Sequence, residues 1–271
     1  MKLKVTTLEH ILGQDWKIVP AGGATGEAFF AKNEDQQLFL KRNSSPFLAV
    51  LSAEGIVPKL VWTRRLESGD VITAQRWLTG RELTQEEMKQ EKVARLLRKI
   101  HQSPPLLTML TRLGKVPLKP EQLLKNLTTS LDKEIASADI IKKAVMYLHE
   151  TLSEIECDEA VVCHCDVNHN NWLLSEEDGQ LFLIDWDGAM IADPAIDLGM
   201  LLHSYVPRDE WVSWLETYGI ELTDYLLKRM NWYVIAQIIL SIQWHKSRNR
   251  FKEMDAWTED LCLMMNNLQE Y

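Results

Sequence analysis

The feature that most constrains this chain is a stretch of polar and reactive side chains between two apolar runs, VVCHCDVNHNNWLL at residues 161–174. Both apolar ends are short and rich in branched or bulky residues, which predicts two β-strands. The turn SEEDGQ separates the second run from another apolar run, LFLI. A hairpin at this turn returns Asp185, which follows LFLI, to the neighbourhood of Asn171. The stretch therefore predicts a polar loop between strands, with a carboxylate brought back beside it.

A metal site is one interpretation of this loop. Cys163, His164 and Cys165 are consecutive, and Cys157 is a fourth candidate ligand. Neighbouring residues in an extended strand point to opposite faces, so His164 does not easily join both cysteines on one zinc ion. Structural zinc sites instead use two separated pairs of ligands. The pattern favours cysteines that are small, buried side chains.

A catalytic loop is the second interpretation. His164, Asp166 and Asn171 have the spacing H-x-D-x-x-x-x-N, which is described for the catalytic loop of kinases. A hydroxyl that accepts a phosphoryl group loses its proton as it attacks, and the Asp166 carboxylate is placed to take that proton. Mg²⁺ prefers hard oxygen ligands, which Asn171 and Asp185 provide. The alternative without catalysis is a polar loop around a buried, hydrogen-bonded His164.

Composition and charge exclude several kinds of partner. Apolar residues make up 46% of the 271 residues and charged residues 25%, as in soluble globular proteins. The net charge of −9 repels phosphates, so we expect no nucleic acid partner. We expect no membrane span, because the apolar run NWYVIAQIILSIQWH is short, and no signal peptide, because Glu9 precedes any long apolar run. Four cysteines in a chain of this length indicate reduced thiols and a cytoplasmic location.

The predicted elements divide the chain into a β-rich part and a helical part. Strands are expected in WKIVPAGGATGEAFFAKN, QLFLKRN and GIVPKLVWTRRLESGDVITAQRW, with one short helix near residues 46–53. A capping box at Thr84 and Glu87 opens a predicted helix that SPPLL ends. A second helix is expected over about 132–155, and three more after Arg208. These elements predict an α+β fold.

The residues around this loop resemble a known family. The segment CHCDVNHNNWLL…LFLIDWDGAMIADPAIDLGMLL is similar to the signature of the aminoglycoside phosphotransferase and choline kinase family of small-molecule kinases, and most similar to bacterial members of unassigned substrate. The match over 162–202 includes the DP and DLG motifs. The resemblance implies a protein-kinase-like fold of two lobes, a small β-rich nucleotide-binding lobe at 1–76 and a larger, mainly helical catalytic and acceptor-binding lobe at 77–271. It also implies ATP and Mg²⁺ as cofactors.

The resemblance further implies roles for individual residues. They are catalysis by Asp166 and His164, metal binding by Asn171 and Asp185, nucleotide binding by Lys41, Gly22, Gly23, Gly26, Gln75 and Trp77, and bracing of the catalytic loop by Asp197. Lys41 corresponds to the lysine that touches the α and β phosphates of the nucleotide. The backbone near Gln75 and Trp77 corresponds to the connector between the lobes, which contacts adenine. Trp186 stands where the kinase D-F-G motif has phenylalanine, and Asp187 is a candidate for substrate or second-metal binding.

The chain departs from the family pattern in two places that bear on activity. Cys165 replaces the usual glycine between the histidine and the aspartate, and a cysteine is strained there if the backbone needs a positive φ. Family members often pair the lysine with a glutamate on a small-lobe helix. Between Lys41 and Pro58 the only acid is Glu54, which comes directly before GIVP and so lies late in this segment for an acid that pairs with the lysine.

The acceptor is the least constrained part of the prediction. A cationic or polyol small molecule is expected, similar to choline, an aminoglycoside, thiamine or a sugar, and the sequence does not indicate an oligomeric state. The C-terminal tryptophans at 211, 214, 232 and 244 offer cation–π contacts to a quaternary ammonium. They also suit a helical core, which is the interpretation we favour.

Two other functions compete with a small-molecule kinase. A pseudokinase that binds nucleotide and has a regulatory or scaffolding role is disfavoured, because Lys41, Asp166, Asn171 and Asp185 are all present. A protein Ser/Thr kinase needs an activation segment ending in APE, yet IDWD is followed almost directly by ADPAIDLG. The acceptor is therefore expected to be small.

Overall fold

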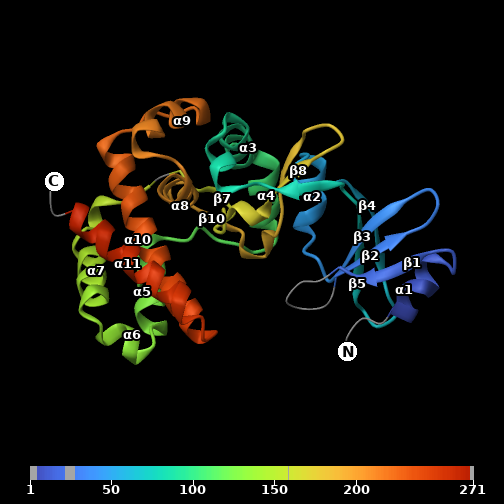
Figure 1. Cartoon of the computed structure of the whole chain (residues 1–271), viewed down its shortest axis with the longest axis horizontal. Coiled ribbons are helices and arrows are strands. Elements are labelled where there is room, and N and C mark those ends of the chain that lie inside the picture. Colours follow the sequence, from blue (N-terminus) through green and yellow to red (C-terminus); the bar gives the residue numbers. More distant parts are fainter. Residues whose placement is uncertain (1–4, 22–27, 158, 269–271) are drawn as a thin grey trace. The chain divides into compact units, whose positions relative to one another are not determined.

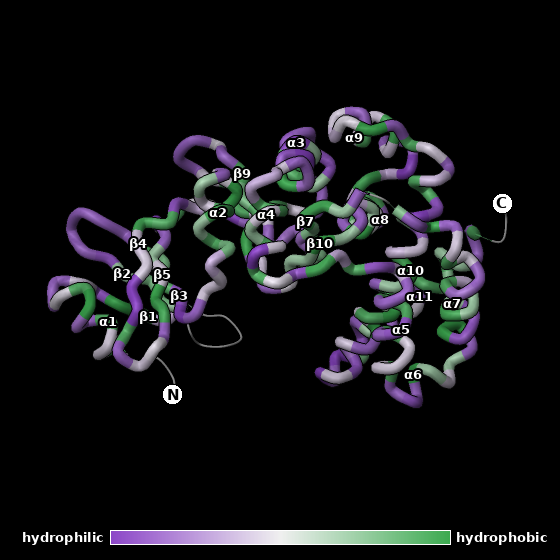
Figure 2. Tube along the Cα trace, turned by 180° about the vertical axis from the view of Figure 1, so that it is seen from behind, coloured by the Kyte–Doolittle hydropathy of each residue, from purple (hydrophilic) through white to green (hydrophobic). Residues whose placement is uncertain are grey.

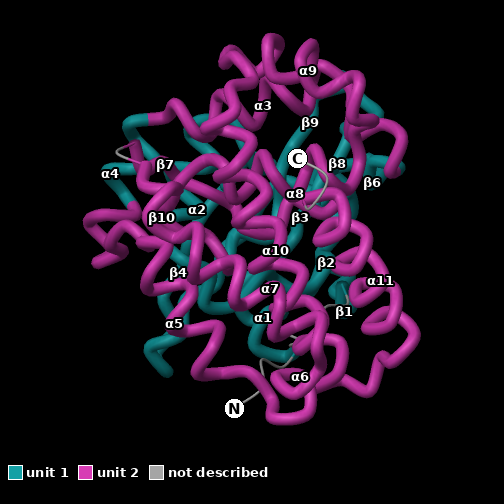
Figure 3. Tube along the Cα trace, turned by 90° about the vertical axis from the view of Figure 1, so that its left-hand side faces the viewer, with its two compact units in different colours: residues 1–84, 104–109, 169–187 teal, residues 85–103, 110–168, 188–271 magenta. Residues whose placement is uncertain are grey.

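The computed structural model describes residues 5–21, 28–157 and 159–268. The chain divides into two compact units, and each unit gathers several segments (Figure 3). Unit 1 takes in 1–84, 104–109 and 169–187, and unit 2 takes in 85–103, 110–168 and 188–271. Most strands belong to unit 1 and most helices to unit 2, so the α+β prediction is confirmed.

Unit 1 contains a five-stranded antiparallel sheet with the strand order β1-β2-β3-β5-β4 (Figure 1). Its strands are β1 (Lys17–Pro20), β2 (Ala28–Lys32), β3 (Gln37–Arg42), β4 (Leu60–Arg65) and β5 (Val71–Arg76). On one face Phe29 and Leu40 are buried against Leu8 from α1 (Val5–Leu12). Successive side chains of a strand point to opposite faces. Lys41 therefore leaves β3 on the face opposite Leu40.

A second sheet of unit 1 contains the predicted hairpin. Its order is β6-β8-β9, and its strands are β6 (Gly80–Glu82), β8 (Trp172–Ser175) and β9 (Leu181–Leu183). Trp172 stands opposite Leu183, which confirms the turn at SEEDGQ. Backbone hydrogen bonds join this hairpin to earlier segments of unit 1: Leu83 donates to Trp172 O (2.9 Å) and Leu183 to Ile56 O (3.0 Å). The short helix α2 (Phe47–Ala53) also matches its prediction.

Helices make up most of unit 2, which also contains the antiparallel strand pair of β7 (Val161–Cys163) and β10 (Met190–Ala192). Figure 2 shows that the trace is hydrophobic at both strands. The α-helices are α3 (Glu91–His101), α5 (Pro120–Ser130), α6 (Lys133–Ser137), α7 (Asp139–Glu150), α8 (Ala195–Tyr205), α9 (Trp211–Tyr218), α10 (Asp224–Ser247) and α11 (Phe251–Asn267), and α4 (Pro104–Arg112) crosses the unit boundary. The short 3-10 turns are η1 (Gln85–Lys89), η2 (Leu152–Glu154), η3 (His169–Asn171), η4 (Trp186–Gly188) and η5 (Arg208–Glu210). The three helices predicted after Arg208 are present.

Two predicted helices are interrupted. The helix after Thr84 begins with the 3-10 turn η1, and α3 starts only at Glu91. The helix predicted over 132–155 breaks at Ala138, whose ψ of 133° is extended. Asp132 caps the first piece by accepting backbone hydrogen bonds from Glu134 (2.9 Å) and Ile135 (3.4 Å).

The long helix α10 is the buried centre of unit 2. It packs along α8, where a Cβ added to Gly199 would lie 2.9 Å from the carbonyl oxygen of Met230. Glycine at this position therefore lets the two backbones approach closely. None of the helices within 5–21, 28–157 and 159–268 combines the length and the apolar content that a membrane span requires.

Candidate functional site

The predicted catalytic loop leaves β7 in unit 2 and is held by one buried carboxylate. Asp197, on α8, is 0% exposed. Its Oδ2 accepts a hydrogen bond from the backbone N–H of His164 (2.7 Å), and its Oδ1 accepts one from Cys165 (2.8 Å). Asp166 follows these two residues and is exposed. The carboxylate thus fixes the backbone immediately before the predicted base.

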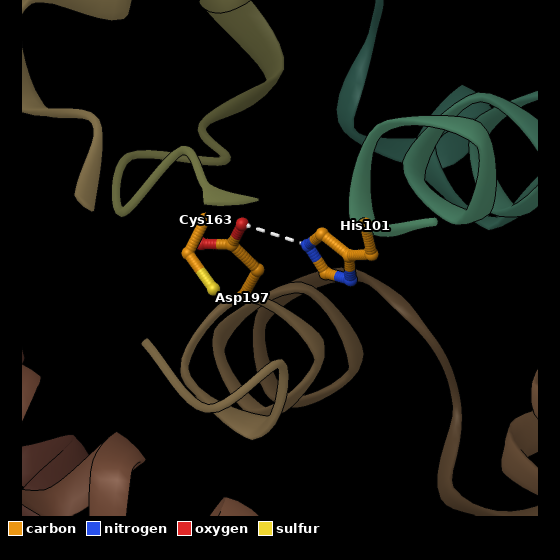
Figure 4. Close-up of side chains that lie close together, drawn as sticks. All are labelled: His101, Cys163 and Asp197. Carbon is orange, nitrogen blue, oxygen red and sulfur yellow. Dashed lines mark hydrogen bonds and ion pairs between the residues drawn. The ribbon is translucent and has the colours of Figure 1, made fainter. Parts of the chain in front are cut away.

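Asp197 also meets a buried histidine of α3. The Nε2 atom of His101 lies 3.1 Å from Asp197 Oδ2 (Figure 4). Burial raises the pKa of Asp197, but hydrogen bonds, first from His101 and then from the backbone amide of His164, help to outweigh it, and the pKa is lowered overall. The carboxylate is therefore ionised and acts only as an acceptor. We did not predict His101 from the sequence, although its place at the end of the apolar face of α3 was a signal.

Cys165 has the backbone conformation that glycine adopts most readily. Its φ is +64°, in the left-handed region where the Cβ of an L-residue crowds the backbone. Burial, followed by the charges of Asp197 and Asp166, raises the pKa of its thiol well above the ordinary value. The thiol is therefore protonated at neutral pH, and the backbone around it carries strain.

Cys165→Gly is expected to be more stable than Cys165→Ala by about 1 kcal/mol, because only glycine relieves the left-handed strain. The free energy of unfolding of the two variants, measured with a chemical denaturant, checks this. Cys262, within helix α11, supplies the control. There the order reverses, since glycine in a helix is less stable than alanine by about 1 kcal/mol. A glycine variant at 165 that is less stable than the alanine variant contradicts the strained conformation.

Within the described part of the chain, the cysteines and histidine considered for a zinc site are not gathered with metal-ligand geometry. Among the described residues, the grouping with metal-ligand geometry is instead His101, Cys163 and Asp197, all buried (Figure 4). Burial and the Asp197 charge raise the pKa of the Cys163 thiol well above its ordinary value. Its Sγ donates to the carbonyl oxygens of Ala192 (3.6 Å) and Asp193 (3.4 Å). In the structure these three side chains belong to one buried, hydrogen-bonded cluster of unit 2.

The predicted metal ligands lie in unit 1, at the open end of the β8–β9 hairpin. The backbone N–H of Ile184 donates to Asn171 O (2.8 Å), so Asn171 is bonded to the residue that directly precedes Asp185. Asp185 is exposed and has a φ of +66°, which aspartate tolerates better than most residues. An amide oxygen and a carboxylate are hard donors that fit Mg²⁺.

Lys41 faces the same segment of unit 1. Its Nζ lies 3.3 Å from Asp187 Oδ2, and the two side chains are 33% and 75% exposed. Such an exposed ion pair contributes little to stability, but it holds the ammonium group of Lys41 at the segment that carries Asp185 and Asp187. The acid that meets Lys41 is thus Asp187, whereas Glu54 lies at the C-cap of α2.

Trp186 is anchored between the two acids. Its indole Nε1 donates to Leu183 O (2.7 Å), and its ring meets Phe47 of α2 edge-on with the centroids 5.7 Å apart. Phe47 is buried. This packing fixes the backbone that carries Asp185 and Asp187.

The predicted nucleotide-binding residues are only partly described. Gly22, Gly23 and Gly26 lie outside the described residues. The side chain of Gln75 is buried and donates to Pro58 O (2.9 Å). The backbone N–H of Arg76 donates to Lys59 O (2.8 Å) and that of Trp77 to Gln37 O (2.9 Å). Hydrogen bonds from a base to Arg76 and Trp77 would therefore use their carbonyl oxygens as acceptors.

The C-terminal tryptophans mostly fill the core of unit 2, as we favoured. Trp211, Trp214 and Trp232 are 7%, 4% and 0% exposed. Trp244 is 44% exposed, but the guanidinium carbons of Arg248 and Arg250 lie 4.2 and 5.3 Å from its ring centroid. Its ring already meets cationic groups of the chain, which does not favour a quaternary ammonium there.

Comparisons with known proteins add a family and a fold. A family model described as "Phosphotransferase enzyme family" matches residues 17–233. The choline kinase LicA from Streptococcus pneumoniae is 19% identical over 95% of this chain and 96% of its own, with a TM-score of 0.69. The spectinomycin phosphotransferase APH(9)-Ia, solved with ADP and spectinomycin, is 18% identical over 92% of each chain, with a TM-score of 0.62. These structures share the fold of this chain, which confirms the prediction of a kinase-like arrangement of a β-rich and a helical lobe.

Proposed function

The chain belongs to the phosphotransferase enzyme family, and on that basis we propose that it transfers the γ-phosphoryl group of ATP to a hydroxyl of a small molecule. Family membership makes it a phosphotransferase, which confirms the resemblance. Similar structures solved with AMP or with ADP support the use of a nucleotide. ATP as the donor, Mg²⁺ and the residue roles below are part of the proposal.

The observation that carries the proposal is the ion pair between Lys41 and Asp187, which lies just after the β8–β9 hairpin in unit 1. The sequence separates Lys41 from Asp187 by 146 positions, yet their charged atoms lie 3.3 Å apart. A lysine ammonium binds phosphate oxygens as a point charge. In the same unit, Asn171 and Asp185 offer the oxygen donors that Mg²⁺ prefers. A cation for phosphate and a donor set for magnesium in one unit are what nucleotide binding requires.

Each residue then has a chemical task. The Asp166 carboxylate accepts a hydrogen bond from the acceptor hydroxyl, orients its oxygen and takes its proton as the new O–P bond forms. Lys41 neutralises charge on the nucleotide phosphates. Mg²⁺, when held by Asn171 and Asp185, would neutralise the charge that develops on the phosphoryl and leaving oxygens. Asp197 keeps the backbone before Asp166 in place.

The proposed acceptor is a small polar molecule with a reactive hydroxyl. The solved relatives include a choline kinase and a phosphotransferase in complex with spectinomycin, so both amino alcohols and antibiotics of the aminoglycoside type belong among the candidates. Thiamine and free sugars complete the set. The negative charge of the chain favours acceptors that carry an amine.

An acceptor screen tests the proposal. The purified full-length protein is incubated with ATP and Mg²⁺ and with choline, ethanolamine, thiamine, aminoglycosides or sugars, and ADP release is measured against a sample without acceptor. We expect one class of acceptor to raise ADP release by at least about tenfold, since kinases reach about 1–100 turnovers per second.

The Asp166→Asn variant is the control for contaminating activity, because it should lose the increase. Nucleotide binding is measured in parallel by titration. Binding of ATP without release of ADP for any acceptor would favour the nucleotide-binding pseudokinase instead.

A further inference from the structure

A chain of hydrogen bonds in unit 2 runs from α9 to the predicted catalytic loop. The hydroxyl of Tyr218, the last residue of α9, lies 2.7 Å from His101 Nδ1. His101 Nε2 lies 3.1 Å from Asp197 Oδ2 (Figure 4). Asp197 in turn accepts the backbone N–H groups of His164 and Cys165. The chain thus links a tyrosine to the two residues before Asp166.

The charge of Asp197 fixes the direction of its own hydrogen bond with His101. An ionised carboxylate only accepts hydrogen bonds, so the proton between it and His101 must sit on Nε2. In a neutral imidazole the other nitrogen, Nδ1, is then an acceptor. Burial raises the pKa of Tyr218 above its ordinary value, so its hydroxyl keeps its proton. In the neutral tautomer with its proton on Nε2, His101 accepts the hydrogen bond of the Tyr218 hydroxyl at Nδ1, so the 2.7 Å contact fits the tautomer that donates to Asp197.

Water has little access to this chain of groups. The side chains of His101 and Asp197 are 1% and 0% exposed, and Tyr218 is 5% exposed. The Tyr218 ring stacks on Trp214, with a centroid distance of 6.2 Å and an interplanar angle of 9°. The guanidinium of Arg98 lies against Gly219, which ends α9 with a φ of +104°. Packing therefore fixes the tyrosine hydroxyl at the His101 ring.

We propose that Tyr218 is a positioning residue for phosphoryl transfer: its hydroxyl holds a neutral His101 with the proton on Nε2, so that Asp197 keeps the backbone before Asp166 in its working geometry. This inference rests on the proposed function of Asp166. Without the tyrosine donor, the ring can place its proton on Nδ1 and turn an unprotonated nitrogen toward the carboxylate. A wrong histidine tautomer of this kind disables a catalytic residue while leaving the surrounding structure intact.

Tyr218→Phe tests the proposal, because it removes one oxygen and keeps the ring. In the full-length protein we expect kcat to fall by roughly tenfold, as for the loss of one hydrogen bond in a network, with the KM for ATP unchanged. Tyr225→Phe is the matched control, since Tyr225 is 46% exposed on α10 and lies outside this chain of groups. It should behave as wild type.

Nitrogen NMR of histidine-labelled protein supplies a readout that does not depend on activity. The wild type should show His101 protonated at Nε2, and the Tyr218→Phe variant should show added protonation at Nδ1. An unchanged His101 tautomer in the variant overturns the proposal, and so does an unchanged kcat in an active enzyme. If no acceptor supports turnover at all, the tautomer result still tests the hydrogen-bond chain, and the failure belongs to the proposed function.

A second pair of variants covers the case in which Tyr218→Phe does not fold. His101→Gln retains a donor for Asp197 and an acceptor for Tyr218, and it has no tautomers. We expect it to keep kcat within about fivefold of wild type, whereas His101→Leu loses roughly tenfold or more for the missing bond. Equal losses in both variants would show that His101 acts through its volume alone, and the proposal would fail.

Discussion

Replacing Asp166 with asparagine is expected to lower kcat for phosphoryl transfer by about 10²- to 10⁴-fold, with nucleotide affinity within about threefold of wild type. Asparagine has almost the volume of aspartate and can still accept a hydrogen bond from the acceptor hydroxyl. It cannot take the proton, so the step in which the hydroxyl attacks loses its base. The backbone is fixed upstream by Asp197 through His164 and Cys165, so the variant should keep the fold of the loop.

Steady-state rates of ADP release with the acceptor found in the screen measure this effect, and a nucleotide titration measures the affinity. Asp255→Asn is the matched control, because Asp255 is an exposed aspartate of the same unit on α11. It should leave both quantities unchanged. Turnover close to wild type in Asp166→Asn would remove this residue from the role of base.

Asp185→Ala is expected to abolish detectable transfer and to weaken magnesium-dependent nucleotide binding by at least about 100-fold, since even residues that only support a metal ligand cost 10- to 100-fold in metal affinity. The loss should be confined to binding in the presence of Mg²⁺. Asp185 has a positive φ, so alanine adds backbone strain to the loss of the ligand. Asp185→Asn separates the two effects, because asparagine tolerates this conformation and lacks only the charge.

Nucleotide titrations with Mg²⁺ and with a chelator measure the effect on binding. Asp178→Ala provides the comparison, as Asp178 is an exposed acid of the turn in the same hairpin. It should bind magnesium and nucleotide as wild type does. If Asp185→Asn keeps full magnesium-dependent binding, another group holds the metal.

Local sequence patterns were sufficient where a whole element carries its own signal. The hairpin of β8 and β9 follows from two apolar runs and a polar turn with Gly179, which has a φ of +71° in the structure. The three helices predicted after Arg208 are present as α9, α10 and α11. Cys165 stands where the family usually has glycine, and its positive φ is the conformation for which a cysteine was expected to be strained.

Other features were not predicted. Helix α1 is one of them, although its apolar residues at 5, 8, 11 and 12 have a helical spacing. Pro104 ends one helix as predicted but also begins α4, since proline suits the first turn of a helix. His101 and Tyr218 are 117 positions apart. Nothing local in the sequence pairs them, because only the packing of α3 against α9 brings them together.

Unit 1 gathers segments that lie far apart in the sequence, and this affects how the protein folds during synthesis. Its first 84 residues leave the ribosome early, but the hairpin that accepts hydrogen bonds from Leu83 and donates to Ile56 is encoded almost a hundred codons later. The amino-terminal segment must therefore wait, incompletely paired, until residue 187 has been synthesised. A gene fragment that stops after Thr84 would remain in that waiting state, with the edge of β6 exposed to self-association.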